Sequence, residues 1–356
     1  MDTSNRFVAF DHIRIFACFS VVLLHVSAWF WYNRPMLSKE WLIADAYNIV
    51  TRAGVPLFVM ISGALFLNPQ KKITTGTLWK KHILRLFIIY LLWTAAYSLQ
   101  SFLQNSADEQ SMKDLFKAIF AGRYHLWFLP MLIGIYATIP ILKIWVEDTA
   151  GSASEKGSKE ESLRYFFLLF FLFQILFTSL CSFFDQPELL SFLDSFRWAH
   201  LCNYIGYFIL GYYLFHIGIS NRSNRLLWRI APICYLGNLL ISVLQNLHTG
   251  SAKSEFFDSF GVFTFFLTIA VFQFYTQKLK YHSVDRPSTR LLTEISKSTL
   301  GIYLIHLMVM ESPWMRPLYA LPIVIAIPII SILTFVISLI VATLLRKLPL
   351  IGRFIC

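Results

Sequence analysis

The N-terminal stretch FVAFDHIRIFACFSVVLLHVSAWFWY, residues 7–32, decides the fold class of this chain. A helix needs about 20 mostly apolar residues to cross a hydrocarbon core about 30 Å thick, and this stretch is long enough. It exceeds the apolar region of a typical signal peptide and carries Asp11 and Arg14. We therefore interpret it as a retained first membrane span.

The composition of the whole chain agrees with this interpretation. Of its 356 residues, 56% are hydrophobic, 17% are aromatic and 14% are charged, whereas a soluble domain carries roughly 25% charged residues. A soluble core could not bury so many apolar side chains, because even large soluble domains leave much of their surface in water. Soluble, fibrous and disordered classes are excluded. The net charge of +11 is read as membrane topology, and no nucleic-acid partner is expected.

Apolar runs of spanning length recur along the chain. The sequence predicts an all-α, polytopic membrane protein with about ten transmembrane helices, in a single domain over residues 7–345 with a short tail at 346–356. The Gly/Ser/Lys/Glu segment from Thr149 to Ser162 is interpreted as a flexible loop. The predicted spans are residues 10–32, 45–68, 82–103, 125–146, 163–184, 200–217, 226–247, 257–277, 292–311 and 319–345.

The positions of the basic residues orient these spans. An even number of spans places both termini on one side, and most of the 31 Lys and Arg then fall in segments on that same side. Basic residues concentrate in cytoplasmic loops, so the termini are predicted to be cytoplasmic. The five cysteines have no regular spacing, and neither a disulfide framework nor a metal site is expected.

Charged and polar side chains inside the first span are the first candidates for function, because such residues are costly in lipid. Asp11 and Arg14 are three residues apart and can pair on one helix face. His25 follows Arg14 by eleven residues, which places the two on one face about 16 Å apart along the axis. Arg14 could instead snorkel to the interface, whereas His25 lies too deep to do so.

Matching depths suggest that further residues join His25. Counted at 1.5 Å per residue, His25 lies about 22 Å, Arg52 about 20 Å and His306 about 21 Å from the cytoplasmic edge. These residues could form one polar layer. A lone intramembrane histidine such as His306 or His12 could instead serve only to hydrogen-bond a neighbouring helix.

A basic cluster marks the cytoplasmic entry to the third predicted span. Lys81, His82 and Arg85 fall on one face of a regular helix and form a plausible phosphate-binding arrangement. The alternative is that they are ordinary topology signals of the kind found in cytoplasmic loops.

Four ordered stretches resemble the acyltransferase family 3 membrane proteins. They are FDHIRIFACFSVVLLH at 10–25, with Arg and His separated by ten residues, VPLFVMISG at 55–63, HLWFLPMLIG at 125–134 and LGIYLIH at 300–306. The resemblance covers residues 7 to 345. It implies a ten-span enzyme of the bacterial inner membrane, in a stand-alone form similar to O-antigen or enterobacterial common antigen O-acetyltransferases.

The resemblance also implies the substrates. The donor would be acetyl-CoA, as a co-substrate without a metal, and the acceptor a hydroxyl of a surface glycan or lipid-linked glycan, with membrane lipid around the protein. Family members often carry Arg-x-x-Arg at the third span, associated with coenzyme A phosphates. Here the positions read His82-x-x-Arg85, and Lys81 would supply the second cation without the planar fork of an arginine.

Roles follow from the chemistry of acyl transfer, which needs a base, help for the oxyanion and a donor site. His25 is the predicted base, and an acyl-His intermediate is the alternative. Arg14, paired with Asp11, would meet the donor, while Arg52 and His306 would orient groups near His25 or stabilise the oxyanion. Trp127, Tyr32 and His125 are predicted to contact the acceptor, and the alternative for the two aromatics is the interfacial belt.

Two other functional classes compete with the acyltransferase. A secondary transporter or flippase shares the many spans and the intramembrane charge, but it predicts helices broken at corresponding places in two halves. Pro56 and Pro130 do not define such halves. A scaffold or sensor without catalytic activity would not explain why Arg14 and His25 lie inside a membrane span.

Overall fold

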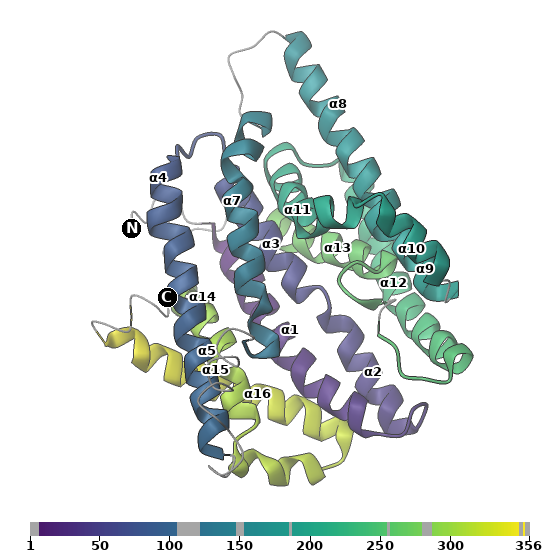
Figure 1. Ribbon diagram of the computed structural model, residues 1–356, viewed down its shortest axis with the longest axis vertical. Coiled ribbons are helices and arrows are strands. Elements are labelled where there is room, and N and C mark those ends of the chain that lie inside the picture. Colours follow the sequence, from purple (N-terminus) through teal and green to yellow (C-terminus); the bar gives the residue numbers. More distant parts are fainter. Residues whose placement is uncertain are drawn as a thin grey trace.

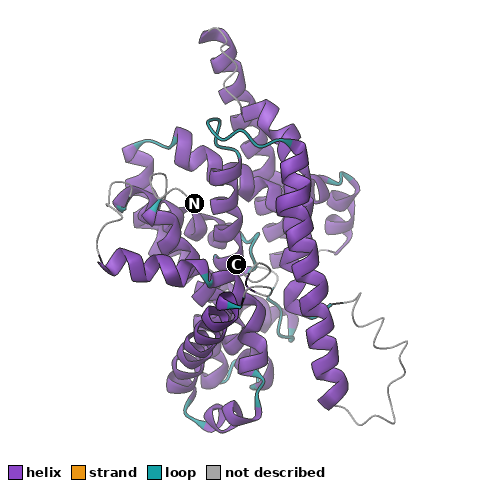
Figure 2. Cartoon of the chain, turned by 90° about the vertical axis from the view of Figure 1, so that its left-hand side faces the viewer, coloured by secondary structure: helices purple, strands orange, loops and turns teal. Residues whose placement is uncertain are grey.

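The computed structural model describes residues 7–104, 122–146, 153–184, 187–254, 257–279, 287–348 and 352. Within these ranges the regular structure is helical, and Figure 2 shows helices joined by loops. The predicted all-α class is confirmed.

The described helices follow one another as α1 (Val8–Asn33), α2 (Lys39–Thr51), α3 (Gly54–Phe66), α4 (Thr75–Thr77), η2 (Leu78–Ile83), α5 (Leu84–Gln104), η3 (Tyr124–Trp127), α7 (Phe128–Val146), α8 (Ala153–Leu169) and η4 (Phe170–Leu176). They continue as α9 (Phe177–Phe184), α10 (Pro187–Ser195), α11 (Trp198–Tyr212), η5 (Tyr213–Ile217), α12 (Asn221–Thr249), α13 (Val262–Lys278), α14 (Pro287–Lys297), α15 (Thr299–Met310), η7 (Pro313–Ala320) and α16 (Ile323–Lys347).

Seven helical segments among the described residues are long and apolar enough to cross a membrane. They are Val8–Asn33, Lys39–Phe66, Thr75–Phe102, Tyr124–Val146, Glu160–Phe183, Asn221–Thr249 and Ile323–Lys347. Three further predicted spans correspond to the shorter helices α11, α13 and α15. The polytopic membrane class is confirmed, and the count of ten stays a prediction.

Helix α1 runs through the middle of the molecule (Figure 1) and packs against α2, α3 and α13 to α16. At its first turns, Ser296 Oγ donates to Asp11 Oδ1 at 2.6 Å. In the last turn of α16, Arg346 Nη1 donates to Ser298 Oγ at 3.1 Å. The start of α1 and the end of α16 therefore meet the same junction between α14 and α15, and the cytoplasmic placement of this end stays a prediction.

Large apolar side chains cover outward faces of the bundle. On α7, for example, Ile141 is 71% exposed and Ile144 is 73% exposed. A soluble protein rarely exposes contiguous apolar surface of this kind, whereas in a membrane these side chains would contact lipid tails. The outward face of α7 is therefore suited to lipid.

The second span is broken in its middle, which the sequence analysis did not foresee. Helix α2 begins at Lys39, earlier than the predicted start at 45, and α3 begins at Gly54. A proline ring clashes with the carbonyl four residues before it, and for Pro56 that residue is Arg52. Arg52 therefore lies at a helix junction, and the depth calculated for it stays a prediction.

The segment interpreted as a flexible loop is largely a helix. Residues 149–152 lie outside the described residues, but α8 begins at Ala153 and projects beyond the other helices at the top of Figure 1. Lysine and glutamate favour helices, and an ion pair four residues apart, between Arg164 and Glu160 at 2.7 Å, adds support. Of the predicted tail, Arg346 and Lys347 belong to α16, and most of the remainder lies outside the described residues.

Candidate active site

Three histidines from distant parts of the sequence meet in the structure. His25 lies on α1, His125 in the short turn η3 and His306 on α15. The ring centroids of His25 and His306 are 5.1 Å apart, those of His125 and His306 are 5.3 Å apart, and those of His25 and His125 are 6.4 Å apart. The structure thus brings together the two histidines of the predicted polar layer and adds a third that was predicted to contact the acceptor.

The ring nitrogens of this cluster have few protein partners. Nδ1 of His306 lies 2.6 Å from the backbone oxygen of Tyr303, so this nitrogen donates, and in the neutral ring Nε2 is left as an acceptor. Nε2 of His306 and both ring nitrogens of His125 are buried without a hydrogen-bond partner among the described residues. Buried polar atoms are nearly always paired, so unpaired ones at this position point to a ligand or a reacting group.

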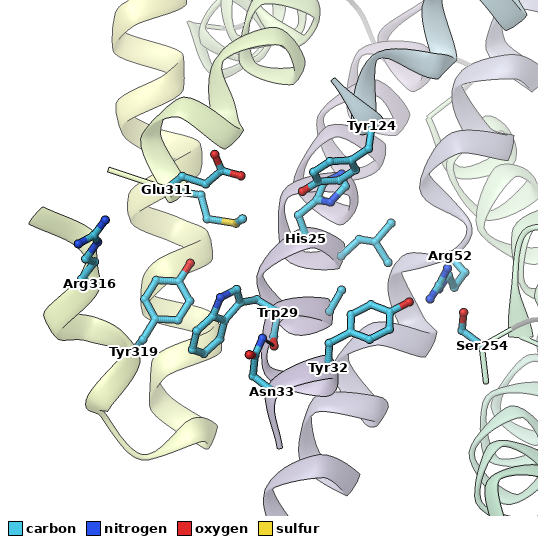
Figure 3. Close-up of a pocket in the computed structure, with 13 residues that line it drawn as sticks. His25, Trp29, Tyr32, Asn33, Arg52, Tyr124, Ser254, Glu311, Arg316 and Tyr319 are labelled. Atoms are coloured by element: carbon cyan, nitrogen blue, oxygen red, sulfur yellow. Dashed lines mark hydrogen bonds between the residues drawn. The ribbon is translucent and has the colours of Figure 1, made fainter. Parts of the chain in front are cut away.

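His25 forms part of the wall of a cavity of about 860 Å³, a size typical of small-molecule sites. Figure 3 shows the side chains around it: Tyr124 lies beside His25 and Tyr319 lies beside Trp29, and Arg52 and Ser254 lie on the opposite side from Glu311 and Arg316. Tyr32 is 68% exposed, which places it at the rim. The cavity therefore runs from exposed surface, near the C-terminal end of α1, to the histidine cluster.

Arg52 enters this cavity from the junction between α2 and α3. Its Nε donates to Asn48 Oδ1 at 2.8 Å, its guanidinium carbon lies 5.1 Å from the centroid of the Phe257 ring, and its Nη1 is 3.4 Å from Asp258 Oδ1. Only 16% of the Arg52 side chain is exposed. These contacts hold the guanidinium in one place.

A charged pair holds the turn that carries His125. Arg123 Nη2 donates to both carboxylate oxygens of Glu311, at 2.6 and 2.7 Å, and so ties the start of η3 to the end of α15. The hydroxyl of Tyr303 donates to the backbone oxygen of His125. His125 is therefore positioned from two sides of its turn.

Asp11 and Arg14 lie at the other end of α1. Asp11 is fully buried, accepts from Ser296 Oγ at 2.6 Å and lies 3.4 Å from Arg14 Nη1, the predicted pair. Neither residue lines the cavity. Eleven residues, or about 16 Å of helix, separate Arg14 from His25. Asp11 is therefore placed to orient Arg14 and to join α1 to α14.

The basic cluster at the third predicted span has a different backbone from the one expected. Lys81 and His82 lie in η2, a π-helical turn, so the spacing of a regular helix does not apply to them. Lys81 is exposed, while His82 and Arg85 are half-buried. π-helical turns occur often at functional sites.

Two further lysines lie beside this cluster. Phe66 contacts the His82 ring at 5.1 Å and Lys71 Nζ at 4.9 Å, measured from its ring centroid. Lys143 Nζ donates to the backbone oxygen of Lys71. Burial, and then the nearby charge of Lys143, lower the pKa of Lys71. Cations that repel one another in this way favour an anion between them.

Comparison with known proteins places the chain. A family model described as an acyltransferase domain, that of acyltransferase family 3, matches residues 7–346. The chain belongs to acyltransferase family 3. No curated protein and no solved structure matches it.

In this membrane acyltransferase, His25 and Arg14 lie toward opposite ends of α1. The cavity with His25, Arg52 and Tyr32 opens near the C-terminal end of α1, whereas Arg14 belongs to its N-terminal part. Trp127 is not among the described residues that line the cavity, and its ring packs against Tyr204 with centroids 5.6 Å apart. The acyltransferase thus has a cavity at the C-terminal end of α1 and, in η2 and the start of α5, a separate group of basic side chains.

Several residues of the cavity escaped the sequence analysis. Tyr124, Ser254, Glu311, Arg316 and Tyr319 all line it. A signal was present for two of them, because Tyr124 adjoins His125 and Glu311 follows the span that carries His306. Ser254 carried no signal, since it lies in a loop with no motif around it.

Proposed function

We propose that this membrane acyltransferase moves an acetyl group from acetyl-CoA to a hydroxyl of a surface polysaccharide or its lipid-linked precursor, with His25 as the general base. The observation that supports this most is the contact of His25, in the wall of the cavity, with His306, because ring nitrogens of His125 and His306 beside it have no hydrogen-bond partner among the described residues. A base within reach of an acceptor hydroxyl is the first requirement of this reaction.

The proposed step transfers one acyl group and one proton. The acceptor oxygen attacks the thioester carbonyl as a ring nitrogen of His25 takes the hydroxyl proton. The tetrahedral adduct then breaks its carbon–sulfur bond, and the departing thiolate receives the proton from His25. The products are an acetyl ester and free coenzyme A.

The neighbouring residues His306 and His125 have different proposed roles beside His25. His306 already uses Nδ1 to bond Tyr303, so its Nε2 can accept from an N–H of His25 and orient that ring, as the third group of a catalytic triad does. The neutral ring of His125 carries one N–H without a protein partner and is suited to donate to the oxyanion. Arg52, held by Asn48 and Phe257 at the far side of the cavity, then orients the acceptor.

The donor would bind from the cytoplasmic side. Lys81, His82 and Arg85, with Lys71 beside them, fit the phosphates of coenzyme A, because several cations gather there around Phe66. Arg14, oriented by Asp11, lies nearer the N-terminal end of α1 than His25 does. In this proposal the pantetheine arm passes inward between helices and brings the thioester to His25.

The test compares His25→Gln with wild type in a strain that lacks the gene, at matched protein levels in the membrane. Loss of a general base typically costs 10² to 10⁴ in rate, so we expect O-acetyl signals in the proton NMR spectrum of the surface glycans only with wild type. His12→Gln is the matched control on the same helix, because His12 stacks on Tyr275 away from the cavity. Equal O-acetylation with His25→Gln would contradict the assignment.

A further inference from the structure

We propose that the acceptor of this enzyme is an acidic glycan, and that Arg52, Tyr32 and Ser254 bind a carboxylate on it. The inference rests on the proposed function and names the substrate class of the same site. In Figure 3 the Arg52 guanidinium, the Tyr32 hydroxyl and the Ser254 hydroxyl lie together on one side of the cavity, and they come from three separate parts of the chain.

The three groups retain free hydrogen-bond donors. Arg52 uses Nε on Asn48 and Nη1 on Asp258, while Nη2 has no hydrogen-bond partner among the described residues. The hydroxyls of Tyr32 and Ser254 likewise have no hydrogen bond to the described part of the chain. A guanidinium with adjacent hydroxyl donors is the arrangement that recognises a planar carboxylate.

Packing holds the Arg52 donor in place, while the Tyr32 ring lies at the rim of the cavity beside the anchored Trp31. The Tyr32 ring meets the Trp31 ring at 4.9 Å, edge to face, and Trp31 Nε1 donates to the buried carboxylate of Asp45 at 2.8 Å. Arg52 is held by Asn48 and by the Phe257 ring. Little freedom of the Arg52 side chain would be lost when an anion binds, which favours affinity.

The charges around the cavity also favour an anion. Among the described residues, the acidic side chain that lines the cavity is Glu311. Both of its carboxylate oxygens already accept hydrogen bonds from Arg123. Arg316 has no ion pair with a described residue, and Asp258, which is 56% exposed, contacts Arg52 at 3.4 Å. Arg52 and Arg316 together carry one more positive charge than Asp258 balances, which suits a ligand with a single negative charge. A carboxylate carries one, whereas a phosphate monoester carries roughly 1.5 to 2.

The distance to His25 suggests where the carboxylate lies on the glycan. Tyr32 follows His25 by seven residues on α1, which is about 10 Å along the helix axis. A glycan that spans this distance presents its acidic sugar to Tyr32 and Arg52, and a hydroxyl of a neighbouring sugar to His25.

The test uses two disaccharide acceptors that differ in one group. One is octyl cellobioside, and the other is the same glycoside with its outer glucose oxidised to glucuronic acid. The purified protein in nanodiscs receives acetyl-CoA and either acceptor, and ester formation, coenzyme A release and the shift of the thermal transition by each glycoside are measured. We expect the acidic acceptor to have a KM roughly tenfold lower, since a charged hydrogen bond contributes about that much.

The variants identify the residues responsible. Tyr32→Phe removes one hydroxyl and Arg52→Gln removes the charge, and each should bring the KM for the acidic acceptor close to that for the neutral one. Arg34→Gln is the matched control, because Arg34 lies on the same end of α1 but packs over Phe30 at 5.7 Å and does not line the cavity. It should keep the preference.

The outcomes separate this inference from the proposed function. Ester formed at equal KM from both acceptors overturns the acidic-acceptor inference and leaves acetyl transfer standing. A thermal shift by the acidic glycoside that Tyr32→Phe abolishes supports the carboxylate site even if no ester forms, and acetyl transfer is then what fails. If no ester forms and neither glycoside shifts the thermal transition selectively, the inference is overturned. Tighter binding of the corresponding phosphorylated cellobioside would overturn it as well.

Discussion

At the scale of single residues, His25 and His306 differ in how their ring nitrogens are used. His306 Nδ1 donates a hydrogen bond to the backbone oxygen of Tyr303. In the neutral ring its Nε2 can therefore only accept a hydrogen bond. His25 lies against it at 5.1 Å and also faces the cavity. The two proposed roles follow: His25 takes up and returns the proton, and His306 orients the His25 ring.

Paired variants of His306 test this division. In His306→Asn the amide replaces Nδ1 and keeps the bond to Tyr303, but nothing remains near the Nε2 position, whereas His306→Gln can place its oxygen there. Loss of one orienting hydrogen bond is worth about 1.4 kcal/mol, or tenfold. We expect kcat to fall about tenfold in His306→Asn and less in His306→Gln, with the KM for acetyl-CoA unchanged. Equal loss in both variants at equal thermal stability would count against the orienting role.

At the scale of elements, two glycines set the closest helix packing. A Cβ atom on Gly63 of α3 would lie 1.7 Å from the backbone oxygen of Phe208, and one on Gly211 of α11 would lie 2.0 Å from that of Met60. Small residues allow membrane helices to approach this closely. Since α3 begins directly after Arg52, this packing also holds the junction from which Arg52 enters the cavity.

Gly63→Ala should therefore destabilise the protein. The added methyl group meets backbone, which has to move, and overpacking of this kind costs about 1 to 3 kcal/mol. We expect a lower transition temperature in detergent, measured by the loss of the monodisperse peak on heating. Gly134→Ala on α7 is the matched control, because a Cβ there meets nothing within 4 Å, and it should be neutral or stabilising. Equal transition temperatures for the two variants would show that α3 and α11 can move apart freely.

At the scale of the whole molecule, the two ends of α1 have different surroundings. Its first turns join α14 through Asp11 and lie beside the junction that Arg346 of α16 contacts, while its last turns line the cavity. Because basic residues gather on one side, the first end is predicted to face the cytoplasm, where coenzyme A is made, and the cavity the opposite side.

Cysteine labelling in intact cells tests this topology. Lys39, at the start of α2, and Lys72, between α3 and α4, are both exposed and lie on opposite sides in the prediction. In a Cys356→Ser background the four described native cysteines are buried. An impermeant maleimide should label Lys39→Cys in intact spheroplasts and Lys72→Cys only after permeabilisation. The reverse pattern would place the termini outside and contradict the route proposed for the donor.

Much of this protein follows from the sequence alone. The apolar runs, the Lys and Arg distribution and the ordered stretches predict the membrane class and the family, because hydropathy and helical periodicity depend on residues close together in the chain. The face shared by Arg14 and His25, and the pairing of Asp11 with Arg14, depend only on the spacing within one helix. The regular helix assumed for Lys81 is replaced by a π-helical turn, and the second span is interrupted just after Arg52.

The composition of the cavity was decided only by the tertiary structure. The approach of His125 to His306, the clamp of Arg123 on Glu311 and the meeting of Tyr32, Arg52 and Ser254 join residues that are far apart in sequence. Such contacts depend on how helices pack and where turns return, and no periodic pattern along the chain encodes them. Sequence determined which side chains cannot remain in lipid, and packing determined which of them meet, because polarity is a property of each residue and proximity a property of the whole bundle.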